Sequence, residues 1–171
     1  MSNPYAHRDA ALDPHRAAQL REEITAFQTE YCSVLDRGDL ERWPEFFTDD
    51  ALYRITAREN TDLNLPVGLV YCEGKAMMID RAVAISRTQM FAPRYTLHLL
   101  GPTRVEAEDE RGIVAQTPVL LIQTLVEGPS TIHLAACYHD RFVRSGQKLL
   151  LAERHVVHDT NVLANDLVYP T

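Results

Sequence analysis

The sequence lacks several features that would assign it to whole classes of protein. Its 171 residues contain no apolar run near the roughly 20 residues that a bilayer crossing needs, and residues 1–13 hold no apolar signal core. A formal net charge of −7, without a basic patch among aromatic residues, disfavours binding to nucleic acid. We therefore expect a cytoplasmic protein with no membrane and no nucleic acid as partner.

Cysteine is also scarce. The three cysteines, Cys32, Cys72 and Cys137, are odd in number, widely spaced and embedded in apolar stretches. This pattern is typical of buried, reduced thiols and not of a disulfide framework. With 46% hydrophobic and 24% charged residues, a single domain of this length can bury its core without disulfides or a structural metal.

The chain has seven histidines, but their spacing does not favour a metal site. His155 and His158 are three apart, which in a strand directs them to opposite faces. His133 and His139 share a face but stand about 20 Å apart at about 3.3 Å per residue. Cys137 and His139 could donate together, yet no second pair with ligand spacing accompanies them. We expect no metal and no cofactor in this chain.

Other catalytic motifs are missing as well. There is no Gly-x-Ser-x-Gly sequence for a nucleophile, and the glycines are isolated at turn positions, so no phosphate-binding loop can form.

The first half of the chain is helical in pattern. Residues 1–12 read as an arm, and residues 13–171 as a single domain. Asp13 and Pro14 are suited to start a helix, and Gly38 is suited to end it. Its apolar positions recur at intervals of three and four, at Ala17, Leu20, Ile24, Phe27, Tyr31 and Val34. A short second helical element follows over residues 40–47, interrupted by Pro44.

The middle of the chain alternates between types of element. Residues 50–58 and 68–72 read as strands, and the polar residues 59–66 between them as a loop. In the first strand Leu52, Arg54 and Thr56 lie on one side, and Tyr53 and Ile55 on the other. Residues 74–89 return to helix, with Met77, Met78, Ala82 and Ile85 predicted to pack inward.

The last half is rich in strands. Four stretches, residues 95–108, 113–126, 131–144 and 148–158, are joined by short turn signals and should pair as antiparallel neighbours. Helices followed by a four-strand meander give an α+β fold, in which the long helix lies across the concave face of a curved sheet.

A cone closed by a sheet and a helix can hold a pocket for general acid and base chemistry. The side chains that could line it are Tyr53, Asp80, His98, Tyr138 and His155. Two rival functions follow: a stand-alone dehydratase or isomerase that uses Asp80, His98 and a tyrosine, or a small-ligand-binding protein without chemistry. The alternative is that these groups only tie strands and helix together, with Asp80 paired to Arg81 or Arg94.

Several segments together resemble the β subunits of aromatic-ring-hydroxylating dioxygenases, which are the small subunits of Rieske non-haem iron oxygenases. They agree with that family in order and spacing from about residue 24 to 170. The segments are Arg42-Trp43-Pro44-Glu45-Phe46-Phe47-Thr48-Asp49-Asp50 with Tyr53, Leu69-Val70-Tyr71-Cys72-Glu73-Gly74-Lys75, Asp80-Arg81, Arg94-Tyr95 with His98, and Glu153-Arg154-His155-Val156-Val157-His158-Asp159-Thr160 followed by Tyr169-Pro170.

The resemblance implies an NTF2-like (cystatin-like) cone, a curved antiparallel sheet wrapped around the long N-terminal helix. It implies a homotrimer beneath three large α subunits (α3β3), in which the α subunit carries the Rieske 2Fe-2S cluster and the mononuclear iron. This chain has no Cys-x-His and Cys-x-x-His pair and no recognisable two-histidine, one-carboxylate site. It would be the non-catalytic subunit of an oxidoreductase for aromatic compound catabolism, with no catalytic residue of its own.

The implied task is mechanical: packing against the large subunits limits their tilt and so keeps their metal centres at electron-transfer distance. Residues 1–12, 59–66 and 163–171 are the candidates for subunit contact, because loops and termini often complete interfaces. The stretch Ala57-Arg58-Glu59-Asn60 is also similar to members that act on carboxylated or hydroxylated single rings, such as salicylate or anthranilate. Substrate choice in the family is governed mainly by the large subunit.

Overall fold

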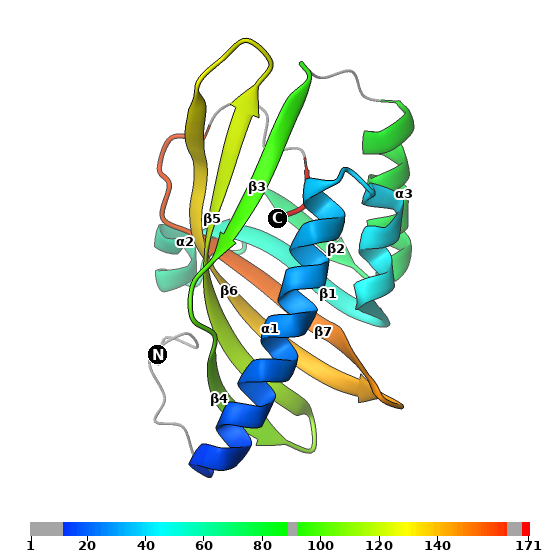
Figure 1. Cartoon of the computed structure of the whole chain (residues 1–171), viewed down its shortest axis with the longest axis vertical. Helices are drawn as coiled ribbons and strands as arrows, with labels where there is room; N and C mark the ends of the chain where they lie inside the picture. Colours follow the sequence, from blue (N-terminus) through cyan, green and yellow to red (C-terminus); the bar gives the residue numbers. More distant parts are fainter. Residues whose placement is uncertain (1–11, 89–91, 164–168) are drawn as a thin grey trace.

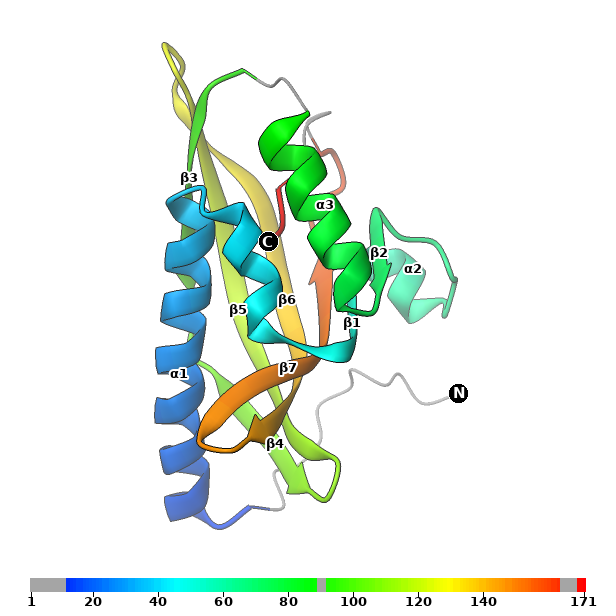
Figure 2. The same cartoon turned by 90° about the vertical axis from the view of Figure 1, so that its right-hand side faces the viewer.

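The structure is a computed structural model that describes residues 12–88, 92–163 and 169–171. A long helix lies across the concave side of a curved sheet, with a second helix at the open edge (Figures 1 and 2). Among the described residues, no helix is both long and apolar enough to span a bilayer. The elements are α1 (Pro14–Asp36), η1 (Leu40–Phe46), β1 (Phe47–Ala57), α2 (Arg58–Asp62), β2 (Val70–Glu73), α3 (Lys75–Arg87), β3 (Arg94–Leu100), β4 (Arg104–Asp109), β5 (Gly112–Leu125), β6 (Ser130–Ser145) and β7 (Lys148–His158).

Helix α1 begins and ends where the sequence predicts. The Asp13 carboxylate accepts a hydrogen bond from the Arg16 amide at 3.1 Å, and Pro14 stands in the first turn. At the other end Gly38 has a left-handed φ of +77°. The buried face of the helix includes Leu20 and Ile24, so the predicted apolar stripe is confirmed.

The sheet has the order β2-β1-β7-β6-β5-β3, and β4 also pairs with β5. Strands β5, β6 and β7 form the predicted antiparallel meander. Strands β3 and β4 lie end to end along the same edge of β5. Strand β1 joins β7 in parallel, which is the single departure from the predicted antiparallel sheet.

Four local predictions differ from the structure. The predicted strand 95–108 is divided into β3 and β4 by Gly101-Pro102-Thr103, since proline cannot donate a ladder hydrogen bond. Residues 58–62, predicted mostly as loop, form the single-turn helix α2. Strand β1 starts at Phe47 and not at residue 50. Met77 is 45% exposed, whereas Met78, Ala82 and Ile85 of α3 are buried as expected.

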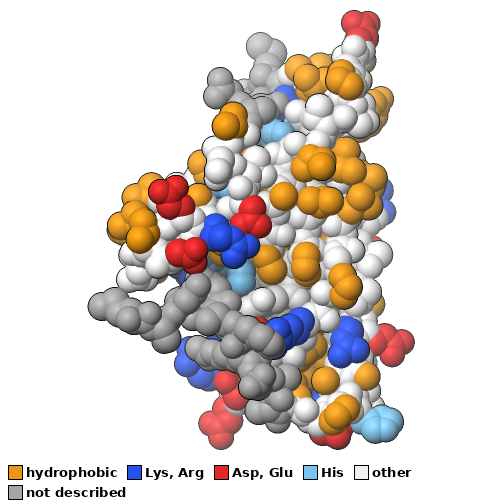
Figure 3. Space-filling view, turned by 90° about the vertical axis from the view of Figure 1, so that its left-hand side faces the viewer, with side chains coloured by type: hydrophobic (Ala, Val, Ile, Leu, Met, Phe, Trp, Pro, Cys, Tyr) orange, Lys and Arg blue, Asp and Glu red, His pale blue; other side chains and the backbone are white. Residues whose placement is uncertain are grey.

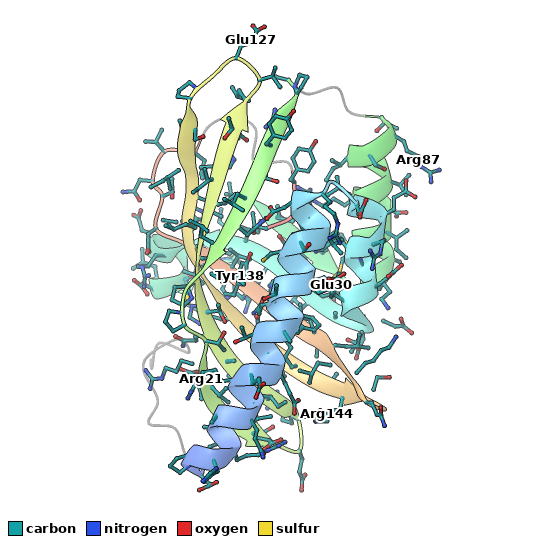
Figure 4. The ribbon with its side chains drawn as sticks, in the orientation of Figure 1. Arg21, Glu30, Arg87, Glu127, Tyr138 and Arg144 are labelled. Carbon is teal, nitrogen blue, oxygen red and sulfur yellow. The ribbon has the colours of Figure 1, made fainter. Side chains whose placement is uncertain are left out.

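One apolar core lies between α1 and the inner face of the sheet. Fully buried side chains from α1, β6 and β7 meet there, among them Leu20, Ile24, Leu134, Phe142 and Val156. Polar contacts fix the rim of this layer: Arg144 of β6 reaches α1 and forms an ion pair with Glu23 at 2.6 Å (Figure 4). Cys32 and Cys72 are buried as predicted, whereas Cys137 is half-buried.

Gly112 stands at a position where the fold should tolerate no side chain. Its φ is +121°, and a Cβ atom there would lie 2.1 Å from the carbonyl oxygen of Phe142. We expect Gly112→Ala to lower the free energy of unfolding by about 3 kcal/mol or more. Gly38→Ala is the matched control, because Gly38 also has a left-handed φ but open space around it. It should cost only about 1 kcal/mol. Urea titration measures both changes, and equal losses would contradict the steric argument.

Candidate functional site

An arginine is buried in the interior of the cone. The Arg154 side chain has no exposed surface and makes two hydrogen bonds to the Asp140 carboxylate, of 2.9 Å from Nε and 2.7 Å from Nη2. Nη2 also donates to the Gln28 Oε1 atom at 2.6 Å, and the Gln28 amide donates to Asp140 at 2.9 Å. These bonds link β7, β6 and α1.

Two aromatic rings enclose the same guanidinium group. Its central carbon lies 4.1 Å from the centroid of the Tyr31 ring and 4.0 Å from that of Tyr138. Tyr138 stands between the sheet and α1 (Figure 4). Cation–π contacts of this kind are strongest where water is excluded. Burial is the largest single influence and lowers the pKa of Arg154, but Asp140, Tyr31 and Tyr138 together outweigh it and raise that pKa well above its ordinary value.

Thr171 lies in the same interior, where tyrosine hydroxyls hold its backbone. Thr171 is fully buried, and its amide donates to the Tyr53 hydroxyl at 2.9 Å. Its carbonyl oxygen accepts a hydrogen bond from the Tyr31 hydroxyl at 3.0 Å, and the Trp43 indole donates to the same hydroxyl at 2.8 Å. Burial raises the pKa of both tyrosines, so they stay neutral hydrogen-bonding groups.

Aromatic side chains fill the rest of the interior. Trp43, Phe47 and Tyr53 meet edge to face, with ring centroids 5.0 to 6.0 Å apart. All three side chains are fully buried. The inner side of the cone is therefore occupied by the protein's own side chains and by Thr171.

A polar cavity of about 440 Å³ lies on the outer face of the sheet, away from α1. Most of its lining is charged or polar, and the charges include both signs. Arg54 pairs with Glu153 at 3.0 Å, and Arg141 with Asp109 at 3.7 Å. The charges of the cavity are thus largely balanced within the chain.

Two histidines line this outer cavity. The His155 Nε2 atom lies 2.6 Å from the Thr56 hydroxyl, which also contacts the hydroxyl of Thr61 on α2 at 2.7 Å. Burial, reinforced by the Arg54 charge, lowers the pKa of His155 to about 3. Burial and the charges of Arg58 and Arg54 lower the pKa of His139 to about 4. Both rings are therefore neutral near pH 7.

The five side chains proposed for acid and base chemistry are not brought together at one cavity of the described residues. Tyr53 and Tyr138 face the filled interior, whereas His155 lies on the outer face and Asp80 is exposed on α3. His98 is buried and held by Asp36 of α1, with the ring nitrogen 2.6 Å from the carboxylate. Arg94, one expected partner of Asp80, instead donates to Gln123 at 3.1 Å.

Residues that organise the interior were not singled out from the sequence. Arg154 occurs within the tail segment that carries the resemblance, but Asp140, Gln28 and Thr171 were not identified. The sequence did contain a signal. Asp140 and Arg154 each stand two residues from an inward-facing residue of the same strand, Tyr138 and Val156, so they share the inward face. An unpaired charge on that face is costly, which indicates that the two residues pair.

The potential metal ligands that the structure describes are dispersed. Among residues 12–88, 92–163 and 169–171, no three His, Cys, Asp or Glu side chains are grouped as a metal ion requires. The donor groups that the structure describes do not fit a Rieske cluster or a mononuclear iron site.

Comparison with known proteins agrees with this geometry. Residues 16–155 match the SnoaL-like domain, which defines the class of fold. The anthranilate 1,2-dioxygenase small subunit of Burkholderia cepacia is 33% identical over 148 residues, covering 86% of this chain and 92% of that subunit. Terephthalate 1,2-dioxygenase of Comamonas has a terminal oxygenase component whose subunit β2 is 29% identical, covering 86% and 96%. A β subunit assigned to an aromatic-ring-hydroxylating dioxygenase of Novosphingobium aromaticivorans superposes with a TM-score of 0.82 at 33% identity, covering 90% of this chain and 97% of that one.

The chain therefore belongs to the family of β, or small, subunits of aromatic-ring-hydroxylating dioxygenases. The resemblance noted in the sequence and the NTF2-like cone that it implied are confirmed. Its family places it among the subunits of dioxygenase complexes, which are oxidoreductases of aromatic catabolism.

Removing the partner of the buried arginine should be far more costly than removing a similar partner at the surface. Asp140→Ala leaves the Arg154 charge buried, and we expect a loss of about 3–5 kcal/mol in the free energy of unfolding. Glu153→Ala removes the partner of half-exposed Arg54 between the adjacent strands β1 and β7 and should cost at most about 1 kcal/mol. Denaturant unfolding of both variants measures the difference. Similar losses would refute the assigned role of Arg154.

The neutral outer-face histidines should make the fold sensitive to acid. Their pKa values in the folded chain lie below the ordinary 6.5, so the unfolded chain takes up protons first as the pH falls. Stability is then lost from about pH 6.5 down to about pH 3 for His155. His155→Gln should flatten the pH dependence of the unfolding free energy by up to about 1.4 kcal/mol per pH unit. The same slope in the variant and in the unmodified chain would contradict this account.

Proposed function

We propose that this chain is a structural, non-catalytic subunit that stabilises the assembly of an iron-bearing large α subunit. The Rieske cluster and the mononuclear iron of the complex would both belong to that partner. The observation that carries the proposal is the filled interior of the cone. An enzyme or a binding protein of this fold needs a cavity into which a small molecule can enter.

Most polar groups of the interior are already engaged. Asp140 and Gln28 accept hydrogen bonds from the Nε and Nη2 atoms of Arg154, and two aromatic rings enclose its guanidinium group, whereas Arg154 Nη1 and the Tyr138 hydroxyl have no hydrogen-bond partner among the described residues. Thr171 is also buried in the interior, where its carbonyl oxygen accepts a hydrogen bond from Tyr31. A ligand would have to displace these contacts, and each displaced buried group would lose its hydrogen bond. This favours a scaffold over the dehydratase, isomerase or ligand-binding alternatives.

Exposed apolar surface supports an assembly role. On the outer face of β3, β5 and β6, apolar side chains between 37% and 72% exposed lie on neighbouring strand positions. We call this the apolar sheet face, and it consists of Tyr95, Leu97, Leu99, Leu120 and Ile132. Hydrophobic side chains gather there in Figure 3. Contiguous apolar surface of this kind marks subunit contacts in soluble proteins. It is suited to another copy of the chain within an α3β3 assembly.

The two curated relatives suggest the class of substrate for the whole complex. Anthranilate and terephthalate, which appear in their names, are both aromatic carboxylates. We extend this class to the complex that contains the present chain, with substrate contacts made by the large subunit. The expectation from residues 57–60 agrees with this class.

The isolated chain should carry no iron and convert no aromatic carboxylate. Co-expressed with the large oxygenase subunit of the same organism, it should form a complex that contains iron and hydroxylates substrate when electrons are supplied. Iron analysis, native mass and product formation measure these outcomes. Stoichiometric iron in the isolated chain, or turnover without a large subunit, would overturn the proposal.

Tyr138→Phe, studied in the assembled complex, tests whether the interior of the cone takes part in catalysis. If the cone only supports the assembly, removing this hydroxyl should leave turnover per complex within about twofold of the unmodified protein. A loss of about 100-fold or more, as expected on removing a general acid or base, would instead support catalysis in the cone. Tyr71→Phe, at an exposed position of β2 outside the apolar sheet face, is the matched control for the substitution.

A further inference from the structure

We propose that residues 63–69 form an anchor that inserts into an apolar pocket on the large subunit, an inference that rests on the proposed function. This segment, the apolar loop, connects α2 with β2. Its apolar side chains are Leu63, Leu65, Val67 and Leu69, and they are 63%, 47%, 59% and 52% exposed. Four large apolar side chains in seven residues, all about half exposed or more, are unusual on a surface without a partner.

The backbone of the apolar loop is held in place. Four amides of the loop donate to backbone oxygens, and the shortest of these bonds run from Leu65 to Asn60 and from Leu69 to Ile55, each at 2.8 Å. The Asn60 side chain donates to the carbonyl of Val67 at 3.1 Å. These bonds hold the loop backbone without help from the four apolar side chains, which are about half exposed or more; Leu65 also borders the 440 Å³ cavity.

At Gly68 the backbone of the loop lies directly against strand β1 of the sheet. A Cβ atom at Gly68 would stand 2.7 Å from the Ile55 carbonyl oxygen, so the close approach to β1 requires glycine. At the base of the loop, α2 is tied to residues beyond β7 by the ion pair between Arg58 and Asp159. A fixed loop loses little conformational freedom on binding, which is the property of a preformed anchor.

The shape and chemistry of this chain favour a different protein as the occupant, not a second copy. The loop projects from the side of the molecule that carries α2 (Figure 2) and needs a concave, apolar partner. The 440 Å³ cavity of the outer face is lined mainly by charged and polar groups. A second cavity, of about 620 Å³ between α1 and the β6–β7 hairpin, has a lining that is half charged. Inserting leucines into either cavity would desolvate charges without pairing them.

The apolar sheet face does not provide such a pocket either. It lies on the convex side of the curved sheet, opposite α1, and a projecting loop touches a convex surface over only a small area. The two apolar surfaces also belong to opposite edges of the sheet, since the loop leads into edge strand β2 and the sheet face centres on edge strand β3. Figure 3 shows them as separate groups of hydrophobic side chains. They can therefore serve two partners at once.

Matched serine variants separate the two surfaces. The loop variant replaces Leu63, Leu65, Val67 and Leu69 by serine, and the sheet variant carries Leu97→Ser and Leu99→Ser. All six leucine or valine side chains are exposed, so both variants should fold with a thermal midpoint close to that of the unmodified chain. The full chain is used throughout, with the large oxygenase subunit of the same organism as the probe.

We expect the loop variant to bind the large subunit about 30-fold or more weakly, the change that follows loss of a hot spot, while its own oligomeric mass stays unchanged. The sheet variant, studied without the large subunit, should have a lower oligomeric mass than the unmodified chain, because its self-association surface is disrupted. In the unmodified complex, amide hydrogen exchange at residues 60–69 should slow on binding. If the loop variant binds the large subunit with unchanged affinity, or if it loses self-association, the assignment of the loop is wrong, while the proposed function still stands. If the unmodified chain does not bind the large subunit, the proposed function itself fails.

Discussion

The contact on which the rest of the structure depends is the one between Arg154 and Asp140. A cation without access to water is tolerated only if its hydrogen bonds are satisfied and an opposite charge is near. Asp140 supplies the charge from the neighbouring strand, Gln28 extends the pair to α1, and the rings of Tyr31 and Tyr138 enclose it. Because these groups come from three separate elements, the pair fixes how the long helix lies across the sheet.

The contact between Arg154 and Asp140 also limits where on the molecule a partner or ligand can bind. With the interior occupied by Arg154, the aromatic cluster and Thr171, the positions that serve catalysis in a hollow cone serve stability here. The features that could bind a partner lie on the outer surface. They are the charge-balanced cavity beside α2, the apolar sheet face and the apolar loop. The expectation that residues 163–171 form a subunit contact is wrong for Thr171, which is buried in this chain. Residues 164–168, and residues 1–11 of the predicted arm 1–12, lie outside the described residues.

Elements set by local chemistry could be predicted from the sequence. The Asp13-Pro14 start of α1 and the turns around Gly112 and Gly146 depend on neighbouring residues, so their positions were right. Two features depend on distant partners and were missed: the parallel pairing of β1 with β7, and the pairing of Asp140 with Arg154. Met77 was placed inward because helical periodicity alone does not show where the covered face of α3 ends. The five polar residues of the proposed pocket had the right chemistry, but strand register puts His155 on the opposite face from Tyr138.

The position of β7 in the sheet has a consequence for how the chain folds. Strand β7 is the last of the described strands in sequence, yet it lies between β6 and β1, and among these strands it alone joins β1 and β2 to the meander. Strands β4 to β7 can assemble from near neighbours, whereas β1 must wait for a partner about a hundred residues further along, and closing so long a loop is slow. During synthesis on the ribosome, the paired strands β1 and β2 have no sheet to join until β7, about a hundred residues after β1, has emerged. Their apolar face is exposed to aggregation or to chaperones during that interval.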